Sequence, residues 1–372
     1  MAITLERKRL FPGFDGKLCK VNPHMMTDGK RCVLSWTMLV LAGSDVFYDD
    51  YVSYSNDCAR TFSEPVKLPD HDIFNDGVRN HFTPSISYYS KYYNKWLKFY
   101  SCEQYANDMH RKCFGREVTY STPYVALFDP EKGDITGGFK KIPLPFDCPS
   151  ACPFGQIIEY DNGEMLLSFY TVKENQTHPY RSTVTARYIL EDGGLKLVSS
   201  GTPISGESVP DSPQPGFLEP SVAQLNGKYY ITLRNEFKGY FAESEDGLSF
   251  SEPKPWVWEN GEPIGSYRTM QRWVRFGDAL YLIYTRPNGL NDHVFRNRAP
   301  LYMTRFDDKC GCLVRNEEII LVPELGARLG NFSVTDISPN EAVLTVAEWM
   351  QPAGCDKYGS DNSIWVVRIK KD

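Results

Sequence analysis

The sequence predicts an all-β protein built as a six-bladed β-propeller, and two observations lead to this fold class. Aromatic residues make up 14% of the 372 residues and are accompanied by 28 Gly and 25 Pro, a composition typical of short strands joined by tight turns. Hairpin turns flanked by apolar strands recur six times, about 50–70 residues apart, the spacing of propeller blades that carry loop insertions. One blade for each turn gives six blades.

The six turns share residues that reverse the chain or favour positive φ. They are Thr27-Asp28-Gly29-Lys30, Tyr93-Asn94-Lys95, Asp161-Asn162-Gly163, Asn226-Gly227, Phe276-Gly277-Asp278 and Pro339-Asn340. The clearest repeat is residues 217–253, where Asn226-Gly227 is the pair typical of a two-residue hairpin turn. Because the chain reverses there, Glu219 at the start of one strand and Arg234 at the end of the next are expected side by side.

The two ends of the chain are expected to meet in the last blade. A first strand over residues 3–11 would complete that blade beside residues 363–369 and close the ring without a covalent link. Such a ring leaves only short, protected strand edges. The sequence contains no linker or low-complexity segment, so we expect one propeller domain over residues 1–372.

Charge and hydropathy exclude several classes of partner. A net charge of −6 and a pI of about 5.7 argue against a nucleic-acid partner and leave local arginines to hold an acidic ligand. The sequence has no 18-residue apolar run for a membrane span and no apolar leader at its start, so we expect a cytoplasmic protein whose ten cysteines are reduced. Cys310-Gly-Cys312 is too closely spaced for a zinc knuckle, and the sequence implies no metal, no cofactor and no particular oligomeric state.

Charged and polar residues fall at the predicted mouth of the ring. The inner strand of each propeller blade lines the axis, and its starting end is expected to face the ligand. These starts are Pro23-His24, Arg79-Asn80-His81, Gln156, Glu219, Gln271-Arg272 and Asn331-Phe332, and the returning strand ends add Arg234, Arg286 and Glu348. Such a collection of carboxylates, arginines and histidines suits a charged sugar.

Two turns carry a family resemblance. Residues 55–62, Ser-Asn-Asp-Cys-Ala-Arg-Thr-Phe, resemble the Asp-box turn Ser-x-Asp-x-Gly-x-Thr-Trp of sialidases, with Ala59 in place of the glycine, and residues 244–250 are similar to a shortened copy. The aspartate is expected to accept hydrogen bonds from backbone N–H groups of the turn. The chain therefore resembles the sialidase (neuraminidase) family with Asp-box (BNR) repeats, which implies a sialidase-like propeller and a glycoside hydrolase.

The resemblance implies roles for individual residues. Asp45 matches the general acid/base of sialidases, on a loop shortly before the first Asp-box. Glu219, in Glu-Pro-Ser, is similar to the glutamate that activates the nucleophile. Arg234 matches the second arginine of the triad that binds the substrate carboxylate, and Arg298 matches the third, with Arg296 as its rival.

Two positions depart from the family pattern. Lys20-Val21-Asn22-Pro23 stands where the first triad arginine is expected, and Phe332-Ser333 stands where the family has its nucleophilic tyrosine. Phenylalanine cannot form a glycosyl-enzyme bond, so the tyrosine route that distinguishes sialidases from two-carboxylate glycosidases is closed to this chain.

The residues leave several mechanisms open. Asp45 and Glu219 are either an acid and a base, inverting if about 6.5–9.5 Å apart, or a loop cap and an ion-pair partner. His81 is a candidate general base for β-elimination, with a tyrosine as proton donor and Arg79 neutralising a uronate carboxylate, as in polysaccharide lyases. His293 lies in a long polar loop, where it is either at the mouth of the ring or simply solvated.

The sequence therefore predicts a carbohydrate-active enzyme, a sialidase-like glycoside hydrolase acting on an oligosaccharide or polysaccharide that carries a sialic acid-like or uronic acid sugar. The alternatives are a polysaccharide lyase and a non-catalytic glycan-binding propeller. The candidate catalytic residues are Asp45, Glu219 and His81, and the candidate substrate-binding residues are Arg234, Arg298, Arg79, Arg272, His293, Gln271 and Glu348.

Overall fold

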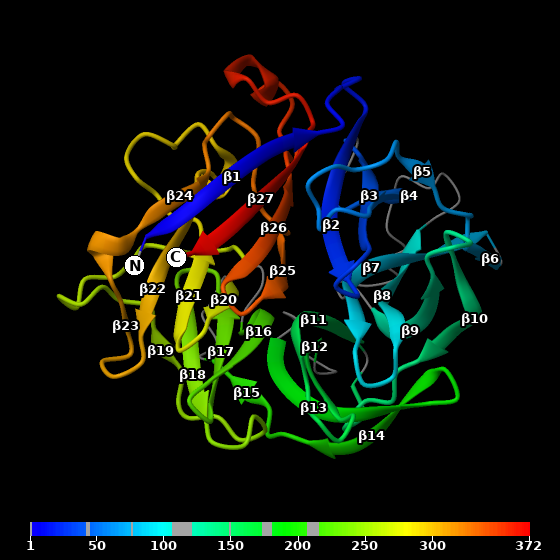
Figure 1. The fold of residues 1–372 in the computed structure, drawn as a ribbon, viewed down its shortest axis with the longest axis horizontal. Helices are drawn as coiled ribbons and strands as arrows, with labels where there is room; N and C mark the ends of the chain where they lie inside the picture. The colour runs from blue at the N-terminus through cyan, green and yellow to red at the C-terminus, as the bar shows by residue number, and fades with distance from the viewer. Residues whose placement is uncertain are drawn as a thin grey trace.

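The fold is a ring of six antiparallel sheets around a central axis (Figure 1). The computed structural model describes residues 2–41, 45–75, 77–105, 121–148, 150–172, 181–206 and 216–372. Each innermost strand contacts the innermost strand of the next sheet, and the last contacts the first, so the ring is closed. The predicted six-bladed β-propeller is confirmed.

Every blade has four strands in a meander from the axis outward. The inner strands are β2 (Leu18–Thr27), β7 (Val78–Ser90), β11 (Ser150–Glu159), β16 (Leu218–Leu225), β20 (Arg272–Phe276) and β25 (Ser333–Ser338). The second strands are β3 (Cys32–Val40), β8 (Lys95–Tyr105), β12 (Met165–Val172), β17 (Lys228–Arg234), β21 (Ala279–Tyr284) and β26 (Glu341–Ala347).

The outer half of each blade is more variable. The third strands are β4 (Phe47–Ser55), β9 (Thr122–Asp129), β13 (Arg181–Glu191), β18 (Gly239–Ser244), β22 (Leu301–Asp307) and β27 (Ile364–Lys371). The outermost are β5 (Val66–Lys67), β10 (Asp134–Lys141), β14 (Gly194–Ser200), β19 (Lys254–Pro255), β23 (Cys312–Leu313) and β1 (Ile3–Leu10). Three short strands extend particular blades: β6 (Ile73–Asn75) pairs with β7, β15 (Ile204–Ser205) with β13, and β24 (Ile319–Val322) with β22.

The chain termini lie side by side in the last blade, as predicted (Figure 1). Strand β1 pairs antiparallel with β27 along its whole length, from Ile3 opposite Lys371 to Leu10 opposite Ile364. The first residues thus supply the outer strand of the blade that the last residues complete.

The six predicted turns all join an inner strand to its second strand. In the β16–β17 hairpin, Asn226 and Gly227 have φ values of 52° and 84°, the left-handed pair that matches the twist of a two-residue hairpin. This turn sets the register in which Leu218 lies opposite Arg234. Apolar side chains between neighbouring sheets form the core, and the largest fully buried ones include Trp256 and Trp273.

The two turns that resemble Asp-boxes share one hydrogen-bond pattern. The carboxylate of Asp57 accepts from the backbone N–H groups of Arg60 and Thr61 at 2.9 and 2.8 Å. Asp246 accepts two equivalent bonds in its own turn, both at 2.8 Å. The pKa of the Asp57 carboxyl is lowered chiefly by the hydrogen bond from the Thr61 hydroxyl and next by that from the Thr61 backbone N–H, and the pKa of Asp246 is lowered chiefly by the bond from the Ser249 N–H. The resemblance of both turns to the sialidase motif stays a sequence prediction.

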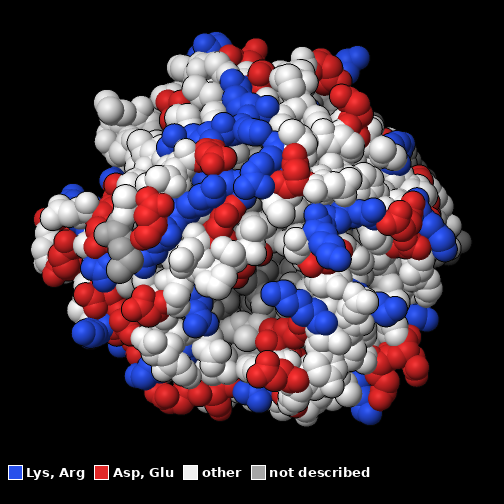
Figure 2. All heavy atoms as spheres, in the orientation of Figure 1, with Lys and Arg blue, Asp and Glu red and all other residues white. Residues whose placement is uncertain are grey.

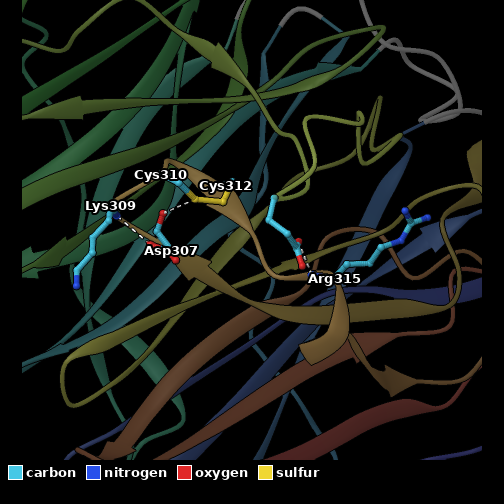
Figure 3. The surroundings of a disulfide bond; sticks show 6 residues. Asp307, Lys309, Cys310, Cys312 and Arg315 are labelled. Atoms are coloured by element: carbon cyan, nitrogen blue, oxygen red, sulfur yellow. Dashed lines mark hydrogen bonds between the residues drawn. A yellow bond between two sulfur atoms is a disulfide. The ribbon is translucent and has the colours of Figure 1, made fainter.

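Cys310 and Cys312 form a disulfide at the tip between β22 and β23, in contrast to the expectation that every cysteine is a free thiol (Figure 3). Their Cα atoms lie 5.4 Å apart, within the range that a disulfide spans. The turn is held further by Asp307, whose carboxylate accepts a hydrogen bond from the backbone N–H of Lys309 at 3.0 Å. Seven other described cysteines are free thiols.

The surface mixes acidic and basic side chains and is hollowed near the centre of the ring (Figure 2). A band of Lys and Arg crosses this face where β1 and β27 lie in Figure 1. Part of the charge on these strands is paired: Arg9 with Glu348 and Asp361, Arg368 with Glu341, and Lys370 with Glu6. In the described part of the chain, no helix has the length and apolar character needed to cross a membrane.

Candidate functional site

A cavity of about 580 Å³ lies on the axis, where strand starts and second-strand ends from several blades meet. This volume is within the range of small-molecule sites in proteins. The charged residues among the described lining are Asp45, Glu103, Glu219, Arg181, Arg234, Arg296, Arg298 and Arg328. Four of the predicted site residues, Asp45, Glu219, Arg234 and Arg298, are therefore brought together.

Glu219 and Arg234 form an ion pair inside this cavity. Glu219 adopts φ 46° at a break in the β16–β17 register between Leu218 and Ser221, which turns its side chain out of the regular alternation. Arg234 ends β17 opposite Leu218, the residue before Glu219, and donates to the Glu219 carboxylate. The predicted juxtaposition of these two residues at one hairpin edge is thus confirmed.

Asp45 reaches the cavity from the segment between β3 and β4. Its backbone is held by Tyr105, whose hydroxyl donates to the Asp45 carbonyl at 2.7 Å and accepts from the N–H of Phe47 at 3.2 Å. Asp45 has φ 55°, a left-handed conformation that is uncommon for a non-glycine residue and concentrates at functional sites.

Arg298 enters the cavity from the loop before β22 and is 5% exposed. Its Nε donates to the carbonyl of Arg268 at 3.2 Å. Burial, together with the nearby charge of Arg234, lowers the pKa of Arg298. A Cβ atom on Gly330 would lie 2.9 Å from the Arg298 guanidinium, so a glycine there leaves room for this arginine.

His81 and Arg79 do not line the cavity, in contrast to the prediction. His81 Nδ1 lies 2.8 Å from Oδ1 of Asp72, and the guanidinium of Arg79 contacts the same carboxylate. This cluster belongs to a second, small cavity of about 30 Å³, lined by His81 and Asp72 among others. Asp72 lies in the loop between β5 and β6. No motif in that loop predicted its contact with His81 and Arg79.

Gln271 and Arg272 also lie outside the residues that line the cavity. Gln271 accepts from Trp256 Nε1 at 3.0 Å and donates to the Ser266 hydroxyl at 3.1 Å, both within the wall of the blade. The Arg272 guanidinium stacks 4.5 Å from the ring centroid of Phe154 and is buried. Burial lowers the pKa of Arg272 to about 10.

Glu348 and His293 are placed away from the axial cavity as well. Glu348 follows β26 and turns outward, where it pairs with Arg9 at 3.0 Å and accepts from Trp365 Nε1 at 2.9 Å. His293 pairs with Glu324 at 3.0 Å and packs on Tyr358. Both are structural contacts of the outer wall and the loops.

Arg328, Glu103 and Arg181 line the cavity but were missed in the sequence. Glu103 lies near the end of β8, and the strand-end rule that selected Arg234 on β17 would have selected it too. Arg328 lies in the loop before β25, and no motif marks it. Burial lowers the pKa of Arg328 to about 10, and the charge of Asp45 acts in the opposite direction.

Phe332, at the position expected for a sialidase tyrosine, is fully buried in the core and does not line the cavity. Tyr170, at the end of β12, is a tyrosine that does line it. Burial raises the pKa of Tyr170 well above its usual value, so its phenol is neutral. Burial also lowers the pKa of His24 on the cavity wall to about 3, so its imidazole is neutral at pH 7.

No cluster of three or more His, Cys, Asp or Glu side chains suited to a metal ion occurs within the described ranges. The charged side chains of the described cavity lining are carboxylates and arginines. Carboxylates can transfer protons or act as nucleophiles, and arginines can bind anions through bidentate hydrogen bonds.

Comparisons with known proteins place the fold. No protein-family model matches the sequence, and no curated protein matches it. A protein of unknown function from Dyadobacter fermentans is 16% identical with a TM-score of 0.69, each chain covering 99% of the other. The NanB sialidase of Streptococcus pneumoniae is 11% identical with a TM-score of 0.65, over 97% of this chain and 70% of that one. The α-L-arabinofuranosidase Arb93A of Fusarium graminearum, solved with an iminosugar inhibitor, is 15% identical with a TM-score of 0.58. The match covers 96% of this chain and 94% of that one.

At these identities the similarity establishes the fold alone. The chain has a sialidase-like propeller fold, which an arabinofuranosidase also adopts. What the axial cavity does must then be argued from its own residues.

Proposed function

We propose that this protein is a glycoside hydrolase that acts on a glycan carrying a sugar carboxylate, either a sialic acid-like sugar or a uronic acid. One observation carries the proposal: Asp45, Glu219, Arg234 and Arg298, from three different parts of the chain, line the same axial cavity. Two carboxylates and two arginines in one cavity provide both an acid/base pair and an anion clamp.

The arginines bind the substrate. Arg298 is buried and has no carboxylate within ion-pair distance among the described residues, so a ligand carboxylate supplies the missing negative charge. Arg234 lies beside the proposed position of the ligand carboxylate, and its own charge is balanced by Glu219. The substrate acid would lie between the two guanidiniums, which fixes the orientation of the sugar ring.

The carboxylates perform the hydrolysis. Asp45 is the acid/base that protonates the leaving oxygen, and Glu219 is the second carboxylate, which acts on water or on the anomeric carbon. Because phenylalanine occupies position 332, the proposed reaction forms no tyrosyl intermediate at that position. The solved sialidase and arabinofuranosidase propellers support the idea that such a ring accommodates glycoside hydrolysis.

The experiment is a screen of fluorogenic glycosides of N-acetylneuraminic, glucuronic and galacturonic acids, with the neutral galactoside and glucoside as controls. We expect release of the fluorophore from at least one acidic glycoside and from neither neutral one. Turnover of neutral glycosides alone would contradict the proposed carboxylate clamp.

A non-catalytic glycan-binding propeller is the second candidate, and the buried Phe332 favours it. Calorimetric binding of an acidic sugar without any product from the same compound would favour this candidate. His81, the base proposed for a lyase, lines the small second cavity, so no comparable observation favours β-elimination.

A further inference from the structure

Positive charge exceeds negative charge in the described lining of the axial cavity. Five arginines face three carboxylates there, and the neutral His24 does not change the balance. One monoanionic sugar would leave this excess only partly compensated. The arrangement of the remaining arginines indicates where a second negative charge would bind.

Three lining arginines are not part of the carboxylate clamp: Arg181, Arg296 and Arg328. The latter two, Arg296 and Arg328, share one feature. Neither has a carboxylate within ion-pair distance among the described residues, and the Nε atom of each is buried without a hydrogen-bond partner. A buried N–H group of a cationic side chain is costly unless an acceptor, best an anion, accompanies it.

Both guanidiniums gather around one aromatic ring. Each lies 5.0 Å from the ring centroid of Phe295, which is 42% exposed and lines the cavity. Arg328 also stacks 4.3 Å from the Trp349 ring and donates to the Gln351 side chain at 2.8 Å. Arg328 is thus held in place before any ligand arrives, which reduces the entropy cost of binding.

The charges that face these two arginines differ, and those that face Arg296 include the clamp residue Arg234. Arg298 interacts most strongly with Arg234 and Glu219, and more weakly with Arg328 and Arg296. Arg328 interacts with Asp45 and then, among the arginines, with Arg296. Arg296 faces the charges of Arg234, Arg268, Glu236 and Glu219.

We propose that Arg296 and Arg328, around Phe295, form a second anion subsite, so that the preferred ligand carries two acidic groups. The inference rests on the proposed function, because the first acidic group is the sugar carboxylate held by Arg234 and Arg298. The second group is a sulfate ester on the acidic glycan or the carboxylate of an adjoining acidic sugar. Both are oxyanions that accept paired hydrogen bonds from guanidinium groups.

The test compares matched ligands that differ by one negative charge, using isothermal titration calorimetry. The pairs are galacturonic acid with digalacturonic acid, N-acetylneuraminic acid with its dimer, and a glucuronic acid-containing disaccharide without and with one sulfate ester. The first two pairs add a carboxylate and the third adds a sulfate. We expect the dianion of at least one pair to bind about tenfold or more tightly than its monoanion, with a steeper loss of affinity as salt is added.

Single-residue variants test whether the tighter binding of the dianion depends on Arg296 and Arg328. Arg296→Gln and Arg328→Gln should each remove most of the dianion's advantage and leave the monoanion's affinity within about twofold, whereas Arg298→Gln should weaken both ligands. Arg315→Gln is the matched control, because Arg315 stacks on Trp258 outside the cavity and its loss removes the same charge. If Arg328→Gln does not fold, Arg296→Gln still tests the subsite.

Three outcomes are distinguishable. Equal affinity within every pair, with the monoanions bound, overturns the second subsite and leaves the proposed function intact. Equal loss of both ligands in Arg296→Gln overturns it too, because Arg296 would then belong to the first clamp. Binding of neutral glycans alone overturns the proposed function and the second subsite together.

Discussion

The Arg234 guanidinium donates to the Glu219 carboxylate across the β16–β17 hairpin, where the two side chains are 6% and 14% exposed. The hairpin register brings the two residues together, and the cavity keeps them partly desolvated. Desolvation of such a pair offsets much of its attraction, so the pair is a weak source of stability by itself. Its position in the cavity fits the roles proposed for Glu219 in hydrolysis and for Arg234 in anion binding.

Replacement of Glu219 by Gln tests this interpretation. The amide is close in shape but carries no charge, so we expect turnover to fall by about 10²–10⁴-fold. The unfolding free energy should also fall, by about 1–3 kcal/mol, because Arg234 is left without its charged acceptor. Steady-state kinetics and urea denaturation measure the two effects. A variant with normal turnover would show that Glu219 is only an ion-pair partner of Arg234.

Replacement of Asp45 by Asn tests the proposed acid/base. The change removes the transferable proton, so turnover should fall by about 10²–10⁴-fold while the dissociation constant for the acidic sugar changes less than about twofold. Asp49→Asn is the matched control, since Asp49 is nearby in sequence but pairs with Lys67 and lines the small second cavity. Unaltered turnover in Asp45→Asn would remove the hydrolase mechanism.

Replacement of His81 by Ala separates a structural histidine from a catalytic one. Because His81 contacts Asp72 and does not line the axial cavity, we expect normal turnover and an unfolding free energy lower by about 1–3 kcal/mol. Thermal denaturation measures the loss of stability. A product that absorbs ultraviolet light through a new double bond, and that disappears in this variant, would instead identify a lyase.

The sequence predicted the fold more completely than the site. Each hairpin turn is a local feature: residues such as Asn226 and Gly227 favour their positive φ values regardless of distant contacts. Six such turns fixed the number of blades, and the charged ends of β16 and β17 fixed one edge of the cavity. The inference of a ring therefore needed no long-range information.

His24 and Asn331, at two other predicted strand starts, also line the cavity, but the remaining strand starts were not predictable in this way. Successive residues of a strand point to opposite faces, so an error of one residue moves a side chain from the cavity into the wall. Gln271 immediately precedes β20 and bonds within its blade, while Met270 lines the cavity. His81 contacts Asp72, a residue of an irregular segment, and does not face the axial cavity. Arg328 comes from a loop whose path depends on the assembled ring.

Lys98 on β8 is a buried cation that the proposed chemistry does not use. Its side chain is fully buried, its Nζ lies 4.9 Å from the ring centroid of Phe128, and Nζ has no hydrogen-bond partner within the described part of the chain. Burial lowers the pKa of Lys98 from 10.5 to about 8, with the charge of Asp50 acting in the opposite direction. At pH 7 the folded protein therefore holds a charged amine in its buried interior, with the carboxyl of Asp50 nearby.

Replacement of Lys98 by Met should stabilise the protein, because it removes this buried charge and keeps an unbranched chain of similar length. A pKa lowered to about 8 corresponds to a cost of up to about 3 kcal/mol below pH 8, and the cost declines as the pH rises from about 8 toward 10.5. We therefore expect the variant's advantage in urea denaturation to be largest at pH 7 and smaller at pH 9.5. An advantage that is absent at pH 7, or equal at both pH values, would show that Lys98 is neutral or solvated in the folded protein.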